Sequence, residues 1–307
     1  MFTIVQRRYW YFGLSLLVII PGMLALLIWG LPLSIDFTSG TLVEVQFAQH
    51  AVPLDIAQVR QVYIDHNYPD TTVQTAGTDT IVVRSKPLSP EDQKTILAAL
   101  SVLYGPSKII SADTVSATVG SEVAQRAALA VGLAAIGILA YITYAFRKAE
   151  HPMRYGIAAI IAMLHDVFVV LGTAALLGHF LGWEVDALFL TALLTVVAFS
   201  VHDTIVVFDR IRENLVVHRR LDYETVVNHS IVQTLDRSIN TQLTVMLTLL
   251  ALALFGGLTV RHFVVTLLIG VFSGTYSSIF NAAPILVVWE NRDWQNLFRR
   301  NKPATAS

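Results

Sequence analysis

The ionisable side chains inside apolar segments are the residues of this sequence best suited to chemistry. Asp203 follows His202 in the stretch "TVVAFSVHDTIVVFDRIREN", whose apolar part is long enough to cross a bilayer. At about 1.5 Å per residue, Asp203 would lie about 7 to 8 Å inside the nearer boundary, too deep for a short side chain to reach water. A carboxylate in hydrocarbon is costly, and such a residue is functional by default.

A second His–Asp pair, His165 and Asp166, lies near the middle of another apolar segment, and Arg237 stands where a further one begins. Because Asp and His residues inside spans commonly form proton relays, we expect a proton pathway through both His–Asp pairs, with Arg237 as the counter-charge of Asp203. Burial raises the pKa of a carboxyl group and a nearby arginine lowers it, so a motion that pairs and unpairs the two groups would release and take up a proton. The alternative is a static ion pair that only holds two helices together.

The composition predicts a multi-pass membrane protein. Of the 307 residues, 54% are hydrophobic and 14% are charged, whereas a soluble domain carries about a quarter charged residues. Apolar runs of about twenty residues, enough to span about 30 Å of hydrocarbon, recur along the chain. The predicted spans cover residues 11–31, 127–146, 155–177, 185–208, 243–255 with its flanks, and 263–289. The first span lacks a small-residue cleavage site and is expected to stay as an anchor.

The distribution of Lys and Arg predicts that both termini are cytoplasmic. The loops after the second and fourth spans and the C-terminal tail would share the side of the N-terminus. Their basic residues are Arg147, Lys148, Arg154, Arg210, Arg212, Arg219, Arg220, Arg292, Arg299, Arg300 and Lys302. On the opposite side, the loop "GHFLGWEVD" has no Lys or Arg, and the loop before the sixth span has only Arg261.

Several classes of function are excluded by what the sequence lacks. The net charge of -1 and the absence of a basic arm argue against a nucleic-acid partner. With no cysteine, disulfides, thiol catalysis and cysteine-ligated metals are excluded. There is no phosphate-binding glycine loop and no catalytic constellation, so we expect neither an enzyme nor a cofactor or metal.

The region between the first two spans predicts a separate α+β domain. Its pattern is a strand at 41–47, a helix at 53–67, two strands at 71–77 and 79–86, a helix from the N-cap Ser89 to Gly105, and a strand at 108–119. The order βαββαβ is that of a ferredoxin-like domain, and the topology puts it on the extracytoplasmic face. The domain is either a compact spacer or a binding surface for a partner or substrate. Its scattered Asp55, Asp65, His66 and Asp70 do not predict a metal site.

The fold expected from these patterns is a six-helix membrane protein with one inserted ferredoxin-like domain. The first helix and its cytoplasmic start occupy residues 1–34, the external domain 35–122, helices two to six 123–290, and the tail 291–307. Within the helical part, residues 209–236 are expected to be cytoplasmic, and "LDYETVVNHSIVQTL" predicts an amphipathic helix on the membrane surface, capped by Asp222. In the sixth span, Gly270, Gly274 and Ser278 predict a smooth face for close helix packing.

Five stretches of the chain resemble the SecF subunit family, which works with SecD beside the Sec protein-translocation channel. "IDFTSGTLVEV" resembles that family's Asp-Phe-Thr-Gly-Gly-Thr entry motif, and "SVHDTIVVFDRIREN" its fourth-span signature. "MLHDVFVVLG", "TLDRSINTQLT" and "LLIGVFSGTYSSIFNAAPIL" match its third, fifth and sixth spans in order. The residues that match the entry motif and continue the fourth-span signature are Asp36, Phe37, Thr38, Gly40, Thr41, Asp209, Arg210, Arg212 and Glu213.

The resemblance implies a subunit of the bacterial plasma membrane related to the proton-driven RND transporters. It implies that proton motive force, used together with SecD, moves external domains that pull emerging polypeptide outward. The expected partners are SecD, the SecYEG channel, the translocating preprotein and protons, without nucleic acid. The family's proton-path aspartate and arginine map onto Asp203 and Arg237, and no ATP site is expected.

The chain departs from the family pattern at two positions, and two other functions are compatible with the sequence. His202 stands where the family has Asn and either adds a titrating group or fills space. Ser39 replaces a Gly of the entry motif and is expected to preserve a turn. The other functions are one half of an RND-type exporter of small molecules or lipids, and an assembly scaffold. A pump half carries larger paired porter domains, whereas one external domain of about ninety residues suits the SecF family.

Overall fold

In the described part of the structure, a computed structural model, six helices are long and apolar enough to cross a membrane, which confirms the six predicted spans. They cover Val5–Trp29, Ala117–Ala145, Pro152–Leu181, Ala187–Val217, Tyr223–Phe255 and Val260–Glu290. The structure describes residues 3–48 and 53–293. Most of the predicted tail, with Arg299, Arg300 and Lys302, lies outside these ranges.

The chain divides into two units. Unit 1 consists of residues 1–31, 130–183 and 188–307 and contains the helical bundle. Unit 2 consists of residues 32–129 and 184–187. It therefore contains the region predicted as an external domain, the start of the second long helix, and four residues from the loop between the third and fourth spans.

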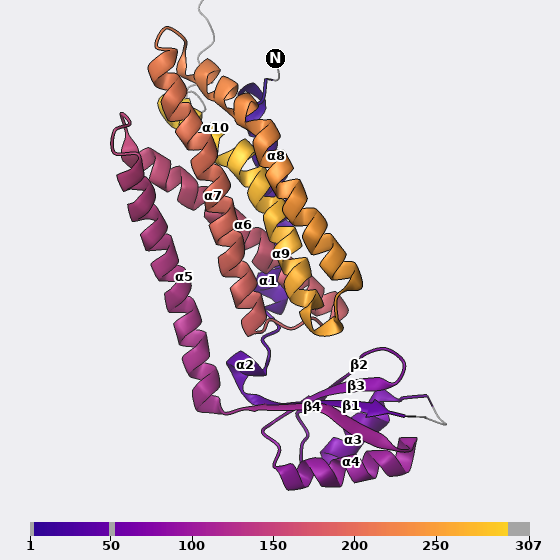
Figure 1. The fold of residues 1–307 in the computed structure, drawn as a ribbon. Coiled ribbons are helices and arrows are strands. Elements are labelled where there is room, and N and C mark those ends of the chain that lie inside the picture. Colours follow the sequence, from indigo (N-terminus) through magenta and orange to yellow (C-terminus); the bar gives the residue numbers. More distant parts are fainter. Residues whose placement is uncertain (1–2, 49–52, 294–307) are drawn as a thin grey trace, which may run out of the picture. The chain divides into compact units, whose positions relative to one another are not determined.

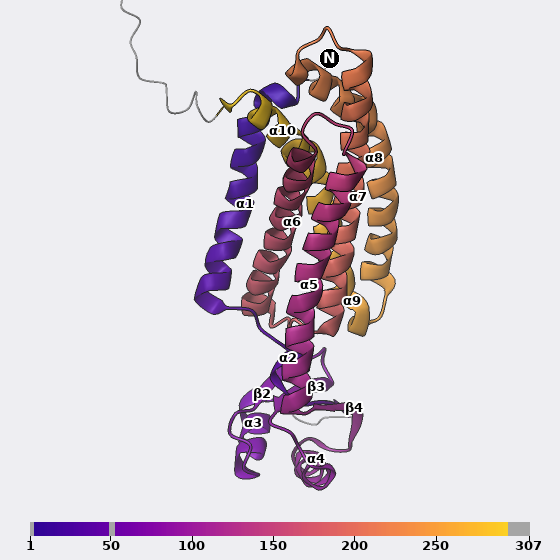
Figure 2. The same ribbon diagram turned by 90° about the vertical axis from the view of Figure 1, so that its left-hand side faces the viewer.

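Long helices of unit 1 lie side by side (Figures 1 and 2). They are α1 (Arg8–Trp29) after a 3-10 turn η1 (Val5–Arg7), α6 (Pro152–Leu181), α7 (Ala187–Val217), α8 (Tyr223–Phe255) and α9 (Leu258–Ser277). Unit 1 also contains the end of α5 (Ala117–Ala145). Helix α1 packs along α6, and α9 packs against both α6 and α8. The buried apolar cluster between these helices includes Ile142, Tyr155, Phe208, Ile231 and Leu286.

The sixth span is interrupted by a π-turn. Element η2 (Ser278–Ala282) separates α9 from the closing helix α10 (Ala283–Glu290). Pro284 lacks the N–H that would bond to the carbonyl group of Phe280, so the regular α-helical ladder cannot continue through this turn. Turns of this kind are frequent at functional sites, and Asn281 within it is buried.

The amphipathic segment that the sequence predicts before the fifth span is continuous with that span. Helix α8 runs without a break from Tyr223 to Phe255, with Asp222 as its N-cap: the Asp222 carboxylate accepts from the Thr225 N–H at 2.9 Å. The predicted amphipathic helix thus leads directly into the fifth span, and nothing in the sequence breaks the helix between the amphipathic part and the apolar part. The predicted N-cap is confirmed.

Small residues allow helices of unit 1 to approach closely. A Cβ atom on Gly22 of α1 would lie 2.9 Å from the Gly172 Cα of α6, so the two backbones are in contact. In the sixth span, a Cβ atom on Gly270 would collide with the Val196 side chain, and one on Gly274 would lie 3.1 Å from the Ser200 Cβ. At these two glycines, which belong to the predicted packing face, the sixth span therefore approaches α7 closely. The crossing of α1 and α6 was not predicted.

Unit 2 is built on a four-stranded antiparallel sheet with two helices on one face (Figure 1). Its elements are α2 (Ile35–Thr38), β1 (Gly40–Phe47), α3 (Ile56–Asp65), β2 (Thr72–Thr75), β3 (Thr80–Ser85), α4 (Pro90–Tyr104) and β4 (Ser107–Val115). After α2, the order is the predicted βαββαβ. The strand order β2-β3-β1-β4 is compatible with the ferredoxin-like arrangement. The register of β1 and β4 shifts between Glu44 and Val45.

The ends of the unit 2 helices follow from their capping residues. Ser89 caps α4 by accepting from the Asp92 N–H at 3.1 Å, and Gly105 ends the helix with a φ of 95°. The last strand is shorter than predicted, because α5 begins at Ala117 and the Val119 N–H points to the Ser116 Oγ at 3.5 Å. The prediction of a strand up to Val119 was wrong, since Ser116 starts a helix there.

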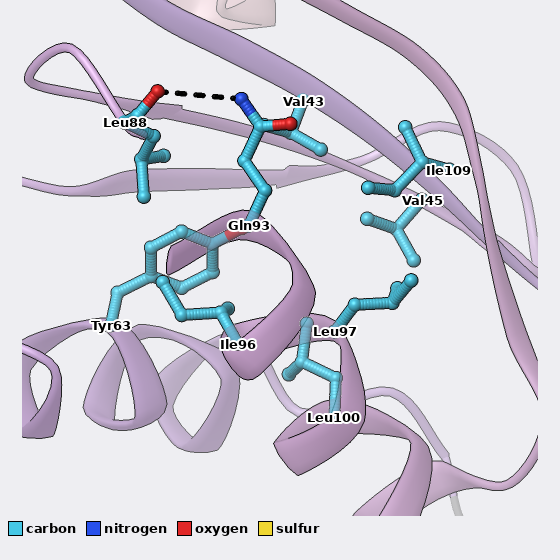
Figure 3. A pocket seen from close by; sticks show the side chains of 9 residues that line it. All are labelled: Val43, Val45, Tyr63, Leu88, Gln93, Ile96, Leu97, Leu100 and Ile109. Atoms are coloured by element: carbon cyan, nitrogen blue, oxygen red, sulfur yellow. Dashed lines mark hydrogen bonds between the residues drawn. The ribbon is translucent and has the colours of Figure 1, made fainter. Parts of the chain in front are cut away.

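A cavity lies in the core of unit 2, between the sheet and α4 (Figure 3). Its lining is Val43, Val45, Tyr63, Leu88, Gln93, Ile96, Leu97, Leu100 and Ile109. The Gln93 amide turns away from the hydrocarbon and donates to the Leu88 carbonyl oxygen at 3.5 Å. This lining predicts packing rather than chemistry.

We expect Gly172→Ala to destabilise unit 1, because the new methyl group would meet the Gly22 backbone, which cannot turn aside as a side chain can. Overpacking of this kind costs about 1–3 kcal/mol. The measurement is the midpoint of thermal unfolding of the detergent-purified protein, followed by tryptophan fluorescence.

Gly13→Ala is the matched control, because a Cβ atom there meets nothing within 4 Å. Both substitutions gain the same intrinsic helix propensity, so the difference between them reports the crossing alone. Equal unfolding midpoints for the two variants would contradict the close approach of α1 and α6.

Candidate functional site

The Asp166 carboxylate is the most completely buried ionisable group at the centre of unit 1. Its side chain is 0% exposed. It accepts hydrogen bonds from the hydroxyl groups of Ser200 on α7 at 2.5 Å, Ser273 on α9 at 2.6 Å, and Ser277 on α9 at 2.7 Å. Three helices thus converge on one carboxylate, whose partners are hydroxyl groups rather than an arginine or lysine.

His165 connects this carboxylate to the first span. Its Nδ1 lies 3.0 Å from an Asp166 oxygen, and its Nε2 lies 3.0 Å from the Ser15 Oγ of α1. Ser15 in turn accepts from the Asn281 amide in the π-turn at 2.9 Å. The network therefore extends across the bundle from α6 to α1 and η2, as a chain of groups that can both donate and accept protons.

Asp203 occupies a second buried position, on α7. Its side chain is 3% exposed, and the Gln242 amide of α8 donates to it. The Gln242 Oε1 and the nearby Ser238 Oγ are buried without a partner among the residues that the structure describes. An amide offers both a donor and an acceptor, so Gln242 can serve Asp203 whether the carboxyl group is ionised or protonated.

Hydroxyl groups connect the surroundings of the two carboxylates. The Thr204 Oγ1, next to Asp203 in sequence, lies 2.9 Å from the Ser278 Oγ. The Ser278 hydroxyl lies 3.0 Å from the carbonyl oxygen of Ser200, whose own hydroxyl donates to Asp166. The close approach of the sixth span to α7 brings these groups together.

The structure does not bring Arg237 to Asp203. Arg237 is exposed. Among the described residues, 3–48 and 53–293, none of the ion pairs includes Arg237. Arg237 and Gln242 are five residues apart, so they point about 140° apart around α8. Among the described residues, the predicted ion pair between Asp203 and Arg237 is therefore absent from this conformation. His202, which follows Val201 and precedes Asp203, is exposed as well.

The residues of the predicted entry motif lie in unit 2, where they form a tight turn before β1. Ser39 has a φ of 66° and Gly40 a φ of 133°, which explains why the family pattern has two glycines at these positions. A Cβ atom on Gly40 would lie 2.6 Å from the Ser85 carbonyl oxygen. Thr41 is buried and accepts from the Leu88 N–H at 2.8 Å. Phe37 belongs to the short helix α2.

The charged residues that end the fourth-span motif form local ion pairs on α7. Arg212 pairs with Asp209 at 2.6 Å, and Arg210 pairs with Glu213 at 2.9 Å. These pairs are largely exposed and each contributes little to stability. The buried contact of this region is made by Asn214, which donates to the Ser230 Oγ of α8 at 2.9 Å.

Comparison with known proteins identifies the family. Residues 96–292 match the family described as "Protein export membrane protein SecD/SecF, C-terminal", and residues 25–49 match the "SecD/SecF GG Motif". The chain belongs to the SecD/SecF family. The glycine-containing turn at Ser39 and Gly40 lies within the second match.

Curated relatives within the SecD/SecF family extend over the whole chain. It is 51% identical to "Protein translocase subunit SecF" of Anaerolinea thermophila, with all of both chains covered. The corresponding protein of Thermobaculum terrenum is 49% identical over the full length of both. "Protein translocase subunit SecDF" of Bacillus subtilis is 35% identical over 94% of this chain and 38% of its own length.

A solved structure of the same family has a similar fold. The crystal structure of SecDF, "a translocon-associated membrane protein", from Thermus thermophilus superposes with a TM-score of 0.83 at 32% identity. The match covers 95% of this chain and 39% of the solved chain. This chain is therefore similar to one part of a longer SecDF polypeptide.

Sequence reasoning found the two buried aspartates and missed the side chains that bind them. Gln242 and the serines at 200, 273 and 277 are uncharged, and nothing in their type separates them from packing residues. The available signal was the spacing of Ser273 and Ser277, which puts both on one face of the sixth span. In the described part of the chain, no three His, Asp or Glu side chains form a group that could hold a metal ion.

We expect Ser273→Ala to lower the stability of unit 1, since it removes one of the hydroxyl groups that bind Asp166 without adding volume. The net worth of such a hydrogen bond is about 1 kcal/mol. The thermal midpoint of the purified protein measures the effect. Ser121→Ala on α5 is the control, because that exposed hydroxyl bonds only to the Thr118 carbonyl oxygen of its own helix. An unchanged midpoint for Ser273→Ala would contradict the contact with Asp166.

Proposed function

We propose that this chain is an auxiliary subunit of the Sec preprotein translocase that uses proton motive force, together with SecD, to promote export of polypeptides. The observation that carries the proposal is the pair of buried carboxylates, Asp166 and Asp203, inside the membrane unit of a SecD/SecF family member. Neither has an arginine or lysine partner among the described residues. The family relationship supports the Sec pathway as the process that this unit serves.

Proton exchange is the chemistry that this arrangement supports. A buried carboxylate without a counter-cation is costly when ionised, and protonation removes that cost. The hydroxyl groups around Asp166 and the amide at Asp203 can serve either protonation state. Asp203 takes up a proton when Arg237 is turned away, as here, and releases it when α8 rotates to bring the arginine closer.

The exposed face of α8 supports the association with SecD. Arg237 shares this face with Asn240, Thr241 and Thr244, all exposed. Polar and charged groups in contact with lipid are costly, so this face requires cover from another membrane protein. SecD covers it in the working complex, which binds the SecYEG channel and the emerging preprotein. The subunit lies in the bacterial plasma membrane, with both termini in the cytoplasm and unit 2 outside.

We expect Asp203→Asn to abolish the stimulation of export by a proton gradient, because the amide keeps the shape of the side chain but cannot exchange a proton. Export into inverted membrane vesicles, with and without a gradient, measures this per assembled complex. Arg237→Ala should also lose the stimulation, and Arg237→Lys should keep part of it, since lysine retains the charge without the planar fork.

Glu122→Gln, which neutralises an exposed carboxylate on α5, is the control and should keep normal stimulation. If Asp203→Asn lowered assembly but kept normal activity per complex, Asp203 would be structural. Normal stimulation of export by Asp203→Asn, together with normal assembly, would contradict the proposal of proton exchange.

The proposed topology is tested by single-cysteine labelling, because the chain has no cysteine of its own. Lys94→Cys, on the exposed side of α4, should react with a membrane-impermeant maleimide added outside the plasma membrane. Arg219→Cys, exposed between α7 and α8, should react only after the membrane is opened. The same accessibility at both positions would contradict the orientation.

A further inference from the structure

The loop between α6 and α7 belongs to unit 2 although both helices belong to unit 1. Residues 184–187 belong to unit 2 together with residues 32–129, whereas the residues before 184 in α6 and after 187 in α7 belong to unit 1. Helix α6 carries Asp166, and α7 carries Asp203. The two helices with buried carboxylates are thus joined by a loop that is built into the other unit.

The main chain of this loop is held by the segment that follows α1. The Val185 N–H donates to the Pro32 carbonyl oxygen at 2.8 Å, and the Ser34 N–H donates to the Val185 carbonyl oxygen at 2.8 Å. Leu33 and Val185 therefore form a parallel β-bridge. The Val185 side chain is buried at 6% exposure.

Arg84, from strand β3, ties the loop to the sheet. Its Nη1 donates to the Glu184 carboxylate at 3.1 Å and to the Leu33 carbonyl oxygen at 2.7 Å, and its Nη2 donates to the Thr38 hydroxyl. The side chains of Arg84 and Glu184 are each 25% exposed. One guanidinium group thus joins the sheet, the entry motif and the loop, a role that suits its fixed fork of donors.

Asp36 of the entry motif binds the beginning of α7. Its carboxylate accepts from the Ala187 N–H at 2.9 Å, and Ala187 is the first residue of that helix. A carboxylate at this position accepts from an N–H of the first helical turn and complements the positive end of the helix dipole. Asp203 lies about 24 Å further along the same helix.

We infer that residues 184–187 form the element that transmits motion of the carboxylate-bearing helices to the external unit, with Arg84–Glu184 as its principal contact. The inference rests on the proposed proton-driven function. A helix moves as a rigid rod, so a shift of α7 displaces the loop, and the bonds above pass this displacement to the sheet. The other chain connections between the units run through α1 and α5, whose described residues include no buried carboxylate.

The charges around the loop make the ion pair necessary. Burial raises the pKa of the Glu184 carboxyl group, Asp186 and Asp36 raise it further, and Arg84 counteracts them. Without Arg84, Glu184 would lose its ion-pair partner while the negative charges of Asp186 and Asp36 still acted on it. Loss of the pair should therefore loosen the loop from the sheet rather than leave it in place.

The experiment uses the full chain reconstituted with SecD and the SecYEG channel in proteoliposomes. It measures gradient-dependent export and, with an internal pH dye, proton movement. Glu184→Arg and Arg84→Glu should each reduce the export stimulation about tenfold while proton movement continues, and the double charge exchange should recover part of it. Glu184→Gln, a milder change, should give a smaller loss of the same kind.

Lys86→Glu is the matched control, since it reverses a charge near the end of β3 in an exposed pair with Asp70 and should leave both readouts unchanged. Normal export stimulation in Glu184→Arg and Arg84→Glu would overturn the inference, as would equal loss of export and proton movement in Glu184→Gln. If wild-type protein showed no gradient-dependent export, the proposed function itself would fail, and the two failures are thus distinguished.

Discussion

A carboxylate inside hydrocarbon must take its hydrogen bonds from the protein, and the helical unit is organised around this constraint. Asp166 obtains them from three serine hydroxyls on two neighbouring helices and from His165. Such short side chains reach the carboxylate only if the helices lie close together. Among the described residues, no arginine or lysine pairs with this carboxylate, so hydroxyl groups and an imidazole satisfy it.

Small residues supply the close approach that this constraint demands. Gly270 and Gly274 let the sixth span meet α7, and two of the serines that bind Asp166, Ser273 and Ser277, lie beside them on the same span. The crossing of α1 and α6 at Gly22 and Gly172 brings Ser15 within reach of His165. In a membrane, where water cannot drive helices together, packing and polar contacts of this kind determine which helices are neighbours. The same residues therefore serve both the packing and the polar network.

Unit 2 is stabilised by ordinary means, and its contacts with residues 184–187 are specific. Its sheet and two capped helices enclose an apolar core. The turn at Ser39 and Gly40 needs positive φ angles, and it positions Asp36 and Thr38 for their contacts with the α6–α7 loop and Arg84. The entry motif of the family therefore also has a structural role. Its backbone conformation and its side-chain hydrogen bonds together hold the α6–α7 loop and Arg84.

The sequence by itself determined the number of spans, the two buried aspartates and the βαββαβ order, because hydropathy, residue period and capping are local properties. Only the tertiary structure decided that Asp203 is bound by Gln242 rather than Arg237, that α8 is continuous, and that residues 184–187 belong to unit 2. The physical reason is that the rotation of a helix about its axis is set by all of its neighbours. Two residues close in sequence, such as Arg237 and Gln242, can therefore face opposite environments.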